Sequence, residues 1–367
     1  MNAYDLAEFW AEDERAHRDN CFCRAHQVAL GIRMSGECVF AELDEPGTPW
    51  KPIPRERRIE LNRRYNDRAE KIVGKRPLPE TFPTPDMAFP YVKRIGEVFG
   101  GRYIYQNDTE WLTQSVDTPE ALEALLDRVD RLDLREFMLP DNWEREKKRL
   151  YETYGLRPPV LRSMRGPVTL ACSIFGPENL IFLGLDEPEL YRRFSDTIAR
   201  VQLGMSAVMD EEAGVTAASR RGFSFYDDSS CLLTPELYHD FGRPVLEAVF
   251  AHYSPDPADW RYQHSDSAMG HILPELAALD LNGVNFGPTV MVPEIRRHLP
   301  HARIEGCVAP FTFMRNDLEG LRCEVLRDIE YGFEYGGVEI ATAGSINNGS
   351  LLTSMRLIME LIQQNRR

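Results

Sequence analysis

The second half of the chain repeats one pattern six times. In each repeat, a short apolar segment is followed by a segment whose apolar residues recur at helical spacing. Several of the second segments open with a capping residue and a proline, as at Thr234 and Pro235, which suits a first helical turn. Strands that alternate with helices predict a parallel sheet with helices outside it. The six expected strands lie in residues 166–175, 222–230, 259–267, 281–288, 302–310 and 337–345.

Two further strands are expected upstream of this repeat. Residues 26–35 and 96–108 each contain an apolar run, and a polar, proline-containing stretch with a helix at 56–73 separates them. Two plus six strands predict an α/β protein with a (β/α)8 TIM-barrel fold and an N-terminal helical extension. We expect a single domain over 1–367, with about 1–25 and 50–80 as extension or insertion. A doubly wound open sheet is the alternative, although no glycine-rich nucleotide-binding loop follows any strand.

Composition excludes several classes of protein. Hydrophobic residues make up 43% and charged residues 28%, which predicts a sizeable core and not disorder. The formal charge of -15 argues against a nucleic-acid or anionic-membrane surface. Neither a signal peptide nor a long apolar run is evident, and seven cysteines fit reduced thiols, so we expect a cytoplasmic protein.

Polar side chains follow each of the six expected strands. The carboxyl ends of barrel strands form the active face, so these side chains are expected to converge on one mouth. They are Cys172 and Ser173; Tyr226, Asp227 and Asp228; His264 and Asp266; Asn285; Glu305 and Cys307; and Ser345, Asn347 and Asn348.

The acidic pair Asp227 and Asp228 cannot both face one pocket, because side chains alternate along a strand. We therefore expect one of them to be structural and favour Asp228 as the catalytic residue. Alternatively, Asp228 hydrogen-bonds to amides of the following loop. His264 and Asp266 are two positions apart and therefore point to the same side. Three roles fit them: a proton-transfer couple, two ligands of a divalent metal, or a histidine held in one tautomer. Alternatively, Asp266 caps the next helix and His264 is a buried structural imidazole.

A metal set is one of the expectations for this region. His264 and Asp266, with Cys307 as a third ligand, would leave an open position for substrate on zinc. Cys307 ends a strand within the short "EGCVAP" corner, although an isolated cysteine is more often a small buried hydrophobe. Arg162 and Arg165 precede an expected strand, so we expect them on the surface, away from the active face. The alternative is that they bind a substrate carboxylate.

Several motifs together resemble a known superfamily. They are "GPVTLA", "DEPEL", "YDDSSCLLTPELYHDFGRPVL", "HSDSAMGHILPELAALDLNGVNF", "IEGCVAP" and "GVEIATAGSI". From residue 166 to the end, the chain resembles the uroporphyrinogen decarboxylase superfamily, whose other branch comprises zinc-dependent, corrinoid-linked methyltransferases of the methylcobalamin:coenzyme M type. The resemblance implies a (β/α)8 barrel with its active cleft at the carboxyl ends of the strands.

The chain departs from both branches of that superfamily. The decarboxylases' N-terminal Arg-Gln-Ala-Gly-Arg-Tyr motif is missing, Ser173 stands near their tyrosine, and Ser345 replaces a late histidine. Asp86 in "TPDMAFPYVKRIG" is similar in position to their catalytic aspartate. The methyltransferases hold zinc with His-x-Cys and a late Gly-Cys, where this chain has His264-Ser265-Asp266 and Gly344-Ser345. Only the histidine is kept, so neither activity transfers intact.

The resemblance implies an enzyme, and its leading interpretation is a methyltransferase acting between a small substrate and a corrinoid or thiol acceptor. Zinc and a corrinoid on a partner protein are the implied cofactors. The alternative is a metal-free lyase or decarboxylase acting on a small carboxylate or a porphyrinogen-like substrate, and a third interpretation is a non-catalytic corrinoid- or tetrapyrrole-binding protein. A small-molecule substrate and a homodimer are expected, with neither nucleic acid nor membrane as partner. The expected catalytic residues are His264, Asp266, Asp228 and Asp86, and the expected substrate contacts are Tyr226, Asn285, Ser345 and Ser173.

Overall fold

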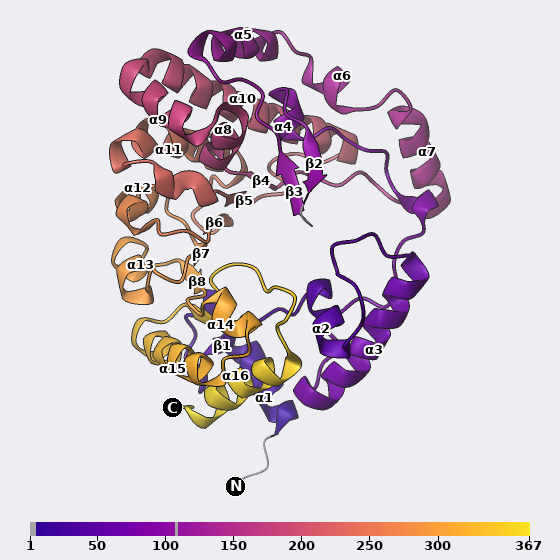
Figure 1. Cartoon of the computed structure of the whole chain (residues 1–367), viewed down its shortest axis with the longest axis vertical. Coiled ribbons are helices and arrows are strands. Elements are labelled where there is room, and N and C mark those ends of the chain that lie inside the picture. Colours follow the sequence, from indigo (N-terminus) through magenta and orange to yellow (C-terminus); the bar gives the residue numbers. More distant parts are fainter. Residues whose placement is uncertain (1–4, 107–108) are drawn as a thin grey trace. The chain divides into compact units, whose positions relative to one another are not determined.

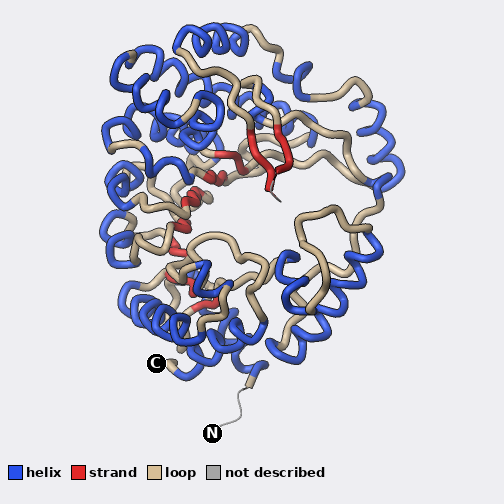
Figure 2. The backbone as a smooth tube through the Cα atoms, viewed as in Figure 1, coloured by secondary structure: helices blue, strands red, loops and turns tan. Residues whose placement is uncertain are grey.

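A computed structural model describes residues 5–106 and 109–367 of the chain (Figure 1). The chain divides into two compact units. Unit 1 comprises Met1–Phe82, Ser265–Gly270 and Asn282–Arg367, and unit 2 comprises Pro83–His264 and His271–Leu281. Figure 2 shows short strands and many helices in both units.

Unit 1 contains the first strand of the main sheet and its last three. Their order is β1-β9-β8-β7, and the printed pairs β1 with β9, β9 with β8 and β8 with β7 are parallel. The strands are β1 (Ala29–Leu30), β7 (Gly283–Phe286), β8 (Arg303–Glu305) and β9 (Val338–Ile340). The helices are α1 (Leu6–Ala16), α2 (Val39–Leu43), α3 (Arg55–Val73), α13 (Val292–His298), α14 (Pro310–Met314), α15 (Leu318–Tyr335) and α16 (Leu352–Gln364).

Unit 2 contains the other three strands of the seven-stranded sheet, in the order β6-β5-β4, and a separate hairpin. The strands are β4 (Ser163–Arg165), β5 (Phe223–Tyr226) and β6 (Arg261–Ser265, whose last residue is counted in unit 1), with β2 (Tyr103–Gln106) and β3 (Thr109–Leu112) in the hairpin. The helices are α4 (Ile95–Val98), α5 (Pro119–Asp130), α6 (Leu134–Met138), α7 (Trp143–Tyr154), α8 (Pro167–Phe175), α9 (Pro177–Asp186), α10 (Pro188–Ala213), α11 (Pro235–Tyr253) and α12 (Leu273–Ala277).

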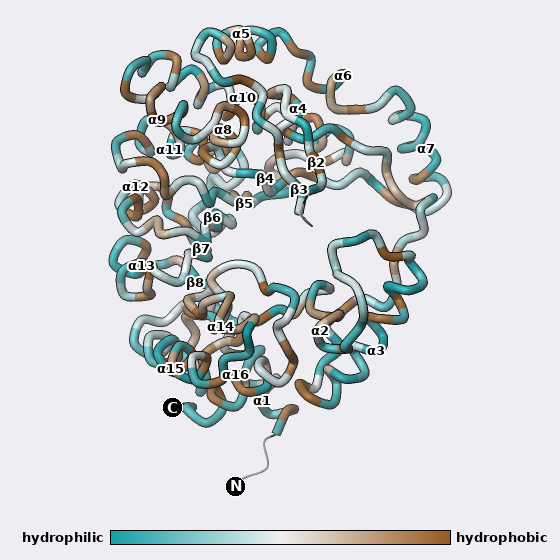
Figure 3. The backbone as a smooth tube through the Cα atoms, in the orientation of Figure 1, coloured by the Kyte–Doolittle hydropathy of each residue, from teal (hydrophilic) through white to brown (hydrophobic). Residues whose placement is uncertain are grey.

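The alternation along β5 determines which face of the sheet is packed. Phe223 and Phe225 are fully buried, and their rings contact Tyr253 and Phe250 of α11 at centroid distances of 5.6 and 5.4 Å. Ser224 and Tyr226 point to the opposite face, as strand alternation requires. By contrast, α7 (WEREKKRLYETY) is mostly hydrophilic, as its teal colour in Figure 3 shows.

The sequence prediction was wrong for the expected strand at 166–175. These residues form helix α8, and the strand β4 lies just before it. Pro167 occupies the first turn of α8, where its missing N–H costs nothing. A short apolar run that is buried on most sides does not show whether it is a helix or a strand, and this caused the error.

The second expected upstream strand, at 96–108, was also assigned wrongly. Its residues Tyr103–Gln106 pair antiparallel with Thr109–Leu112 in a two-stranded sheet, apart from the main sheet, and residues 107 and 108 lie outside the described part. Two other predictions in this half are confirmed: the strand within 26–35 is β1, and the helix at 56–73 lies within α3.

Candidate functional site

The two aspartates after β5 have different surroundings. Asp227 is completely buried, and its Oδ1 accepts a hydrogen bond from the backbone N–H of Thr169, in the first turn of α8, at 2.7 Å. Burial raises the pKa of Asp227 to about 6, against the hydrogen bonds from Thr169 and Val168, which lower it. Asp227 therefore ties the end of β5 to the start of α8, while the side chain of Asp228 is 46% exposed.

Close packing at this point requires a glycine. A Cβ added at Gly166 would come closer than 3.0 Å to the side chain of Asp227, a separation that real Cβ atoms essentially never show. The backbone N–H of Gly166 donates to the carbonyl of Tyr226 at 2.7 Å. The Gly166-Pro167 pair thus ends β4 and lets α8 begin directly against β5.

His264 lies at the end of β6, beside β5. In the strand register, Tyr226 is the partner of His264, and their rings are 5.8 Å apart. The Nε2 atom of His264 is 3.6 Å from Oδ1 of Asp228, and the histidine side chain is only 16% exposed. A partly buried imidazole that faces a carboxylate can transfer a proton or bind a cation.

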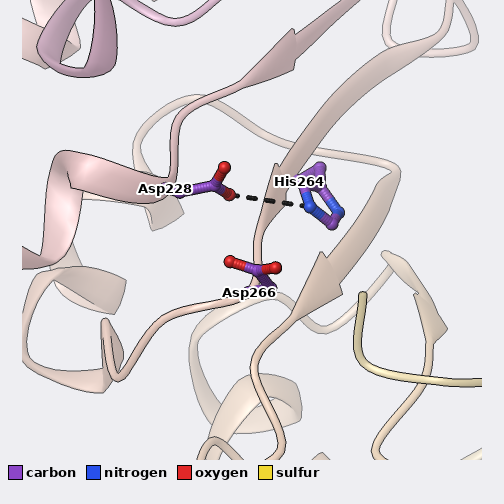
Figure 4. A group of neighbouring side chains, drawn as sticks. All are labelled: Asp228, His264 and Asp266. Carbon is purple, nitrogen blue, oxygen red and sulfur yellow. Dashed lines mark ion pairs between the residues drawn. The ribbon is translucent and has the colours of Figure 1, made fainter. Parts of the chain in front are cut away.

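Asp266 follows His264 by two residues, and the carboxylates of Asp228 and Asp266 face its imidazole (Figure 4). One ligand atom from each of the three residues lies within 4.8 Å of the other two. In unit 1, two glycines approach Asp266 closely: a Cβ at Gly287 would lie 2.8 Å from its carbonyl carbon, and one at Gly344 would lie 3.2 Å from its Cβ.

This group of three offers one imidazole nitrogen and two carboxylate oxygens. These are ligands for a divalent cation such as zinc or a harder metal, and three protein ligands would leave a position open for substrate. The residues therefore fit a divalent cation. Their oxygen and nitrogen donors are harder than a set with thiolates, as expected from an aspartate at position 266 in place of a cysteine.

The structure does not place Cys307 in this group. Its thiol is buried, its Sγ donates to the carbonyl of Val290 at 3.5 Å, and burial raises its pKa far above the usual range. Cysteine binds metals as a thiolate, so a thiol with so high a pKa is a poor metal ligand.

Two of the expected substrate contacts lie in unit 1. The Asn285 amide donates to the carbonyl of Glu305, the last residue of β8, and to that of Thr342, just after β9, the latter at 3.0 Å. Ser345 is exposed, and its carbonyl accepts a hydrogen bond from Asn347 at 3.5 Å. Both remain predictions as substrate contacts.

Ser173 and Arg165 lie together in unit 2. Ser173 is in α8 and not at a strand end; its hydroxyl donates to the Thr169 carbonyl at 2.9 Å and accepts from Nη2 of Arg165 at 3.0 Å. Arg165 is the last residue of β4, partly buried, and the register partner of Tyr226. The expectation of a surface position for Arg165 was wrong, because it rested on the misplaced strand. The signal in the sequence is the Gly166-Pro167 pair, which is typical of a helix start and places Arg165 at the end of the preceding strand.

Asp86 lies in a short 3-10 turn (Pro85–Met87) and is exposed. The hydroxyl of Tyr154 donates to its carboxylate, and Arg149 donates to its backbone carbonyl at 2.8 Å. Hydrogen bonds from Thr84 and Tyr154 lower the pKa of Asp86. These contacts hold the turn against α7, and a catalytic role for Asp86 remains a prediction.

Within residues 5–106 and 109–367, no single helix has the length and apolar character needed to cross a membrane. The helices α8 and α9 meet the length and composition criterion only as a pair, and the chain bends by 102° between them.

Comparison with solved structures shows the fold. A methyltransferase from Methanosarcina mazei matches with a TM-score of 0.58 and 15% sequence identity, over 96% of this chain and 97% of that one. Together with the parallel seven-stranded sheet, this match confirms the α/β class with a TIM-barrel-like fold.

Comparison of the sequence adds the family. A search of curated proteins finds no significant match. The family model for uroporphyrinogen decarboxylase (URO-D) matches residues 111–344, which is more than half of the chain and includes Asp228, His264 and Asp266. The superfamily that the sequence motifs indicated is therefore confirmed, and the chain belongs to the uroporphyrinogen decarboxylase family.

Proposed function

We propose that this chain is a metal-dependent methyltransferase that moves a methyl group between a small substrate and a corrinoid or thiol acceptor. The observation that carries the proposal is the convergence of Asp228, His264 and Asp266, with ligand atoms within 4.8 Å of one another. The fold shared with a methyltransferase supports the reaction class.

The chemistry follows from what a methyl transfer requires. The methyl group moves without its bonding electron pair, so the acceptor must supply an electron pair and release any proton that it carries. A divalent cation held by His264 and Asp266 would acidify or orient the acceptor. Asp228 lies 3.6 Å from His264 and is the group that we assign to anchor the substrate or take the proton. A corrinoid, where it is the partner, would be carried by another protein.

Metal analysis of the purified protein tests the proposal. We expect about one equivalent of zinc or another divalent metal per chain in the wild type, and less than about 0.1 equivalent in His264→Ala with the fold retained. His301→Ala is the matched control, because His301 is exposed and outside the group. It should keep the wild-type metal content.

Activity is followed with methylcobalamin and a small thiol, because demethylation changes the visible spectrum of the corrinoid. The wild type and His301→Ala should catalyse the change, and a chelator should abolish it. Absence of metal in the wild type, or activity indifferent to chelators, would overturn the metal-dependent assignment. Chelator-resistant release of carbon dioxide from a small carboxylate would instead favour a lyase that uses the Asp228–His264 pair for proton transfer.

A further inference from the structure

We propose that the substrate carries a carboxylate on an apolar body, and that Arg165 binds this carboxylate in a cavity of unit 2. This inference rests on the proposed function and names the substrate class. The cavity has a volume of about 390 Å³, within the range of small-molecule sites. Its walls are largely apolar, and its charged lining residues are Lys93, Arg94, Glu110 and Arg165.

The positive charge of Arg94 is already compensated within the cavity. Its Nη1 and Nη2 atoms donate to the two oxygens of Glu110 at 2.6 and 2.9 Å, and its guanidinium lies 3.3 Å from the ring centroid of Tyr103. A bidentate pair of this kind leaves little capacity for another anion. Arg94 and Glu110 therefore form a neutral part of the wall.

Arg165 is not compensated in the same way. In the described part of the chain, its guanidinium makes one hydrogen bond, from Nη2 to the neutral hydroxyl of Ser173 at 3.0 Å. Its Nε is buried and lacks a hydrogen-bond partner among the same residues. The guanidinium as a whole is only partly buried and lines the cavity, so its remaining N–H donors can bind an anion there.

The electrostatic field of Arg165 extends into the cavity. The hydrogen bonds from Arg94 lower the pKa of Glu110, and the charge of Arg165 lowers it further. Lys93 adds another positive charge at the lining, and its Nζ lies over the ring of Phe137 at 4.1 Å. With Arg94 and Glu110 neutralised, the cavity keeps an excess of positive charge that favours an anion.

Strand register relates this cation to His264. Arg165 pairs with Tyr226, and Tyr226 pairs with His264, so the three residues form one row across β4, β5 and β6. Neighbouring strands are about 4.8 Å apart, which places the Arg165 and His264 backbones roughly 10 Å from each other. The residues that line the cavity do not include His264, so the inference requires a ligand long enough to extend from Arg165 along this row toward His264.

The apolar part of the cavity indicates the remainder of the substrate. Met164, Met205 and Met209 contribute flexible, polarisable side chains, and Ile95 and Leu161 add aliphatic surface. A guanidinium fork matches the oxygens of a carboxylate or of a phosphate. We commit to the carboxylate, because a largely apolar lining with Arg165 as its binding cation suits a single negative charge better than the higher charge of a phosphate.

Paired probes test the inference on the purified full-length chain. Calorimetry compares 3-phenylpropanoate with 3-phenylpropanamide, and octanoate with octanamide, because each pair differs only in the charged group. In the wild type we expect the acid to bind roughly tenfold or more tightly than the amide, and Arg165→Met should lose this preference. Arg145→Met is the matched control: this arginine lies in α7, is 75% exposed, and should leave the preference unchanged.

A wild type that shows no preference for the acid in either pair, including one that binds none of the probes, would overturn the inference. So would a preference that persists in a folded Arg165→Met, or tighter binding of phenyl phosphate than of both carboxylates. Should Arg165→Met fail to fold, Arg165→Lys replaces it. The lysine keeps the charge but loses the fork, so the preference should fall several-fold, and an unchanged preference would contradict the assignment.

The two proposals fail separately. Arg165→Met should keep its metal, and His264→Ala should keep its preference for acids. Loss of metal dependence with an intact acid preference would overturn only the proposed reaction, whereas normal metal content without any acid preference would overturn only the carboxylate.

Discussion

Asp227 and Asp228 are adjacent in the sequence but have different surroundings. Asp227 is buried against α8 and Asp228 faces His264, a difference that alternation along a strand predicted. The pairing of His264 with Asp266 could also be predicted from their spacing. For Arg165, the sequence favoured a surface position over binding of a carboxylate. The position of Arg165 depends on which residue ends β4 and on a cavity formed by segments distant in sequence.

Asp227→Asn should make stability less dependent on pH. The pKa of Asp227 in the folded chain, about 6, lies above its ordinary value of 3.8, so between these values the folded chain holds a proton that the unfolded chain has lost. This carboxyl therefore lowers the free energy of unfolding as pH rises from about 4 to 6, by up to roughly 3 kcal/mol. Asparagine does not titrate.

Urea unfolding at pH 4 and pH 7.5 measures this effect. The stability of Asp227→Asn relative to the wild type should increase between the two pH values. Asp196→Asn, at an exposed position of α10, is the control and should show no such trend. If the difference in unfolding free energy between Asp227→Asn and the wild type were the same at both pH values, Asp227 would not take up a proton in the folded chain.

At the scale of elements, the sequence predicted the strands that have turns on either side. It did not predict the junction between β4 and α8. The five later strands lie where the alternation placed them, because each is a short apolar segment with a helix start after it. At α8 the same apolar character belongs to a buried helix, and the real strand has only three residues, Ser163–Arg165. Composition cannot separate these cases without knowing the packing around them.

Gly166→Ala should disturb this junction. The new methyl group would collide with Asp227 and force β5 and α8 apart, so we expect the free energy of unfolding to fall by about 1 to 3 kcal/mol. Metal binding should weaken as well, because a shift of Asp227 would also move Asp228, the residue that follows it in the chain. Gly36→Ala is the control, since its nearest neighbour would be Nη1 of Arg58 at 3.6 Å, and it should change stability by about 0.5 kcal/mol or less. Equal effects of the two substitutions on unfolding by urea would refute the packing argument.

At the scale of the whole molecule, the barrel class could be predicted from the order of strands and helices, but the place of the N-terminal segment could not. Residues 1–25 were expected to be an extension of the barrel, and this remains a prediction; in the structure, α1 packs within unit 1. Phe9 is completely buried, and Oδ1 of Asp13 accepts a hydrogen bond from the backbone N–H of Leu30 in β1 at 2.8 Å. A mostly polar helix such as α1 gives no sign in its sequence of the neighbour that it covers.

Phe9→Ala should therefore behave as a core substitution. We expect it to lower the free energy of unfolding by about 3 to 5 kcal/mol, measured with urea. Phe182→Ala is the matched control, because Phe182 is 60% exposed on α9, and its loss should cost far less. A Phe9→Ala variant as stable as the Phe182→Ala variant would show that α1 contributes little to unit 1.

The partly buried position of Arg165 also has a kinetic consequence. The whole chain carries a formal charge of -15, so a carboxylate in solution is repelled at long range and feels Arg165 only at short range. Added salt screens that repulsion and therefore increases the association rate. Salt screens the contact between the carboxylate and Arg165 much less, because that contact is shielded from solvent. For such a ligand, selectivity arises in the time that it stays bound rather than in the rate at which it arrives.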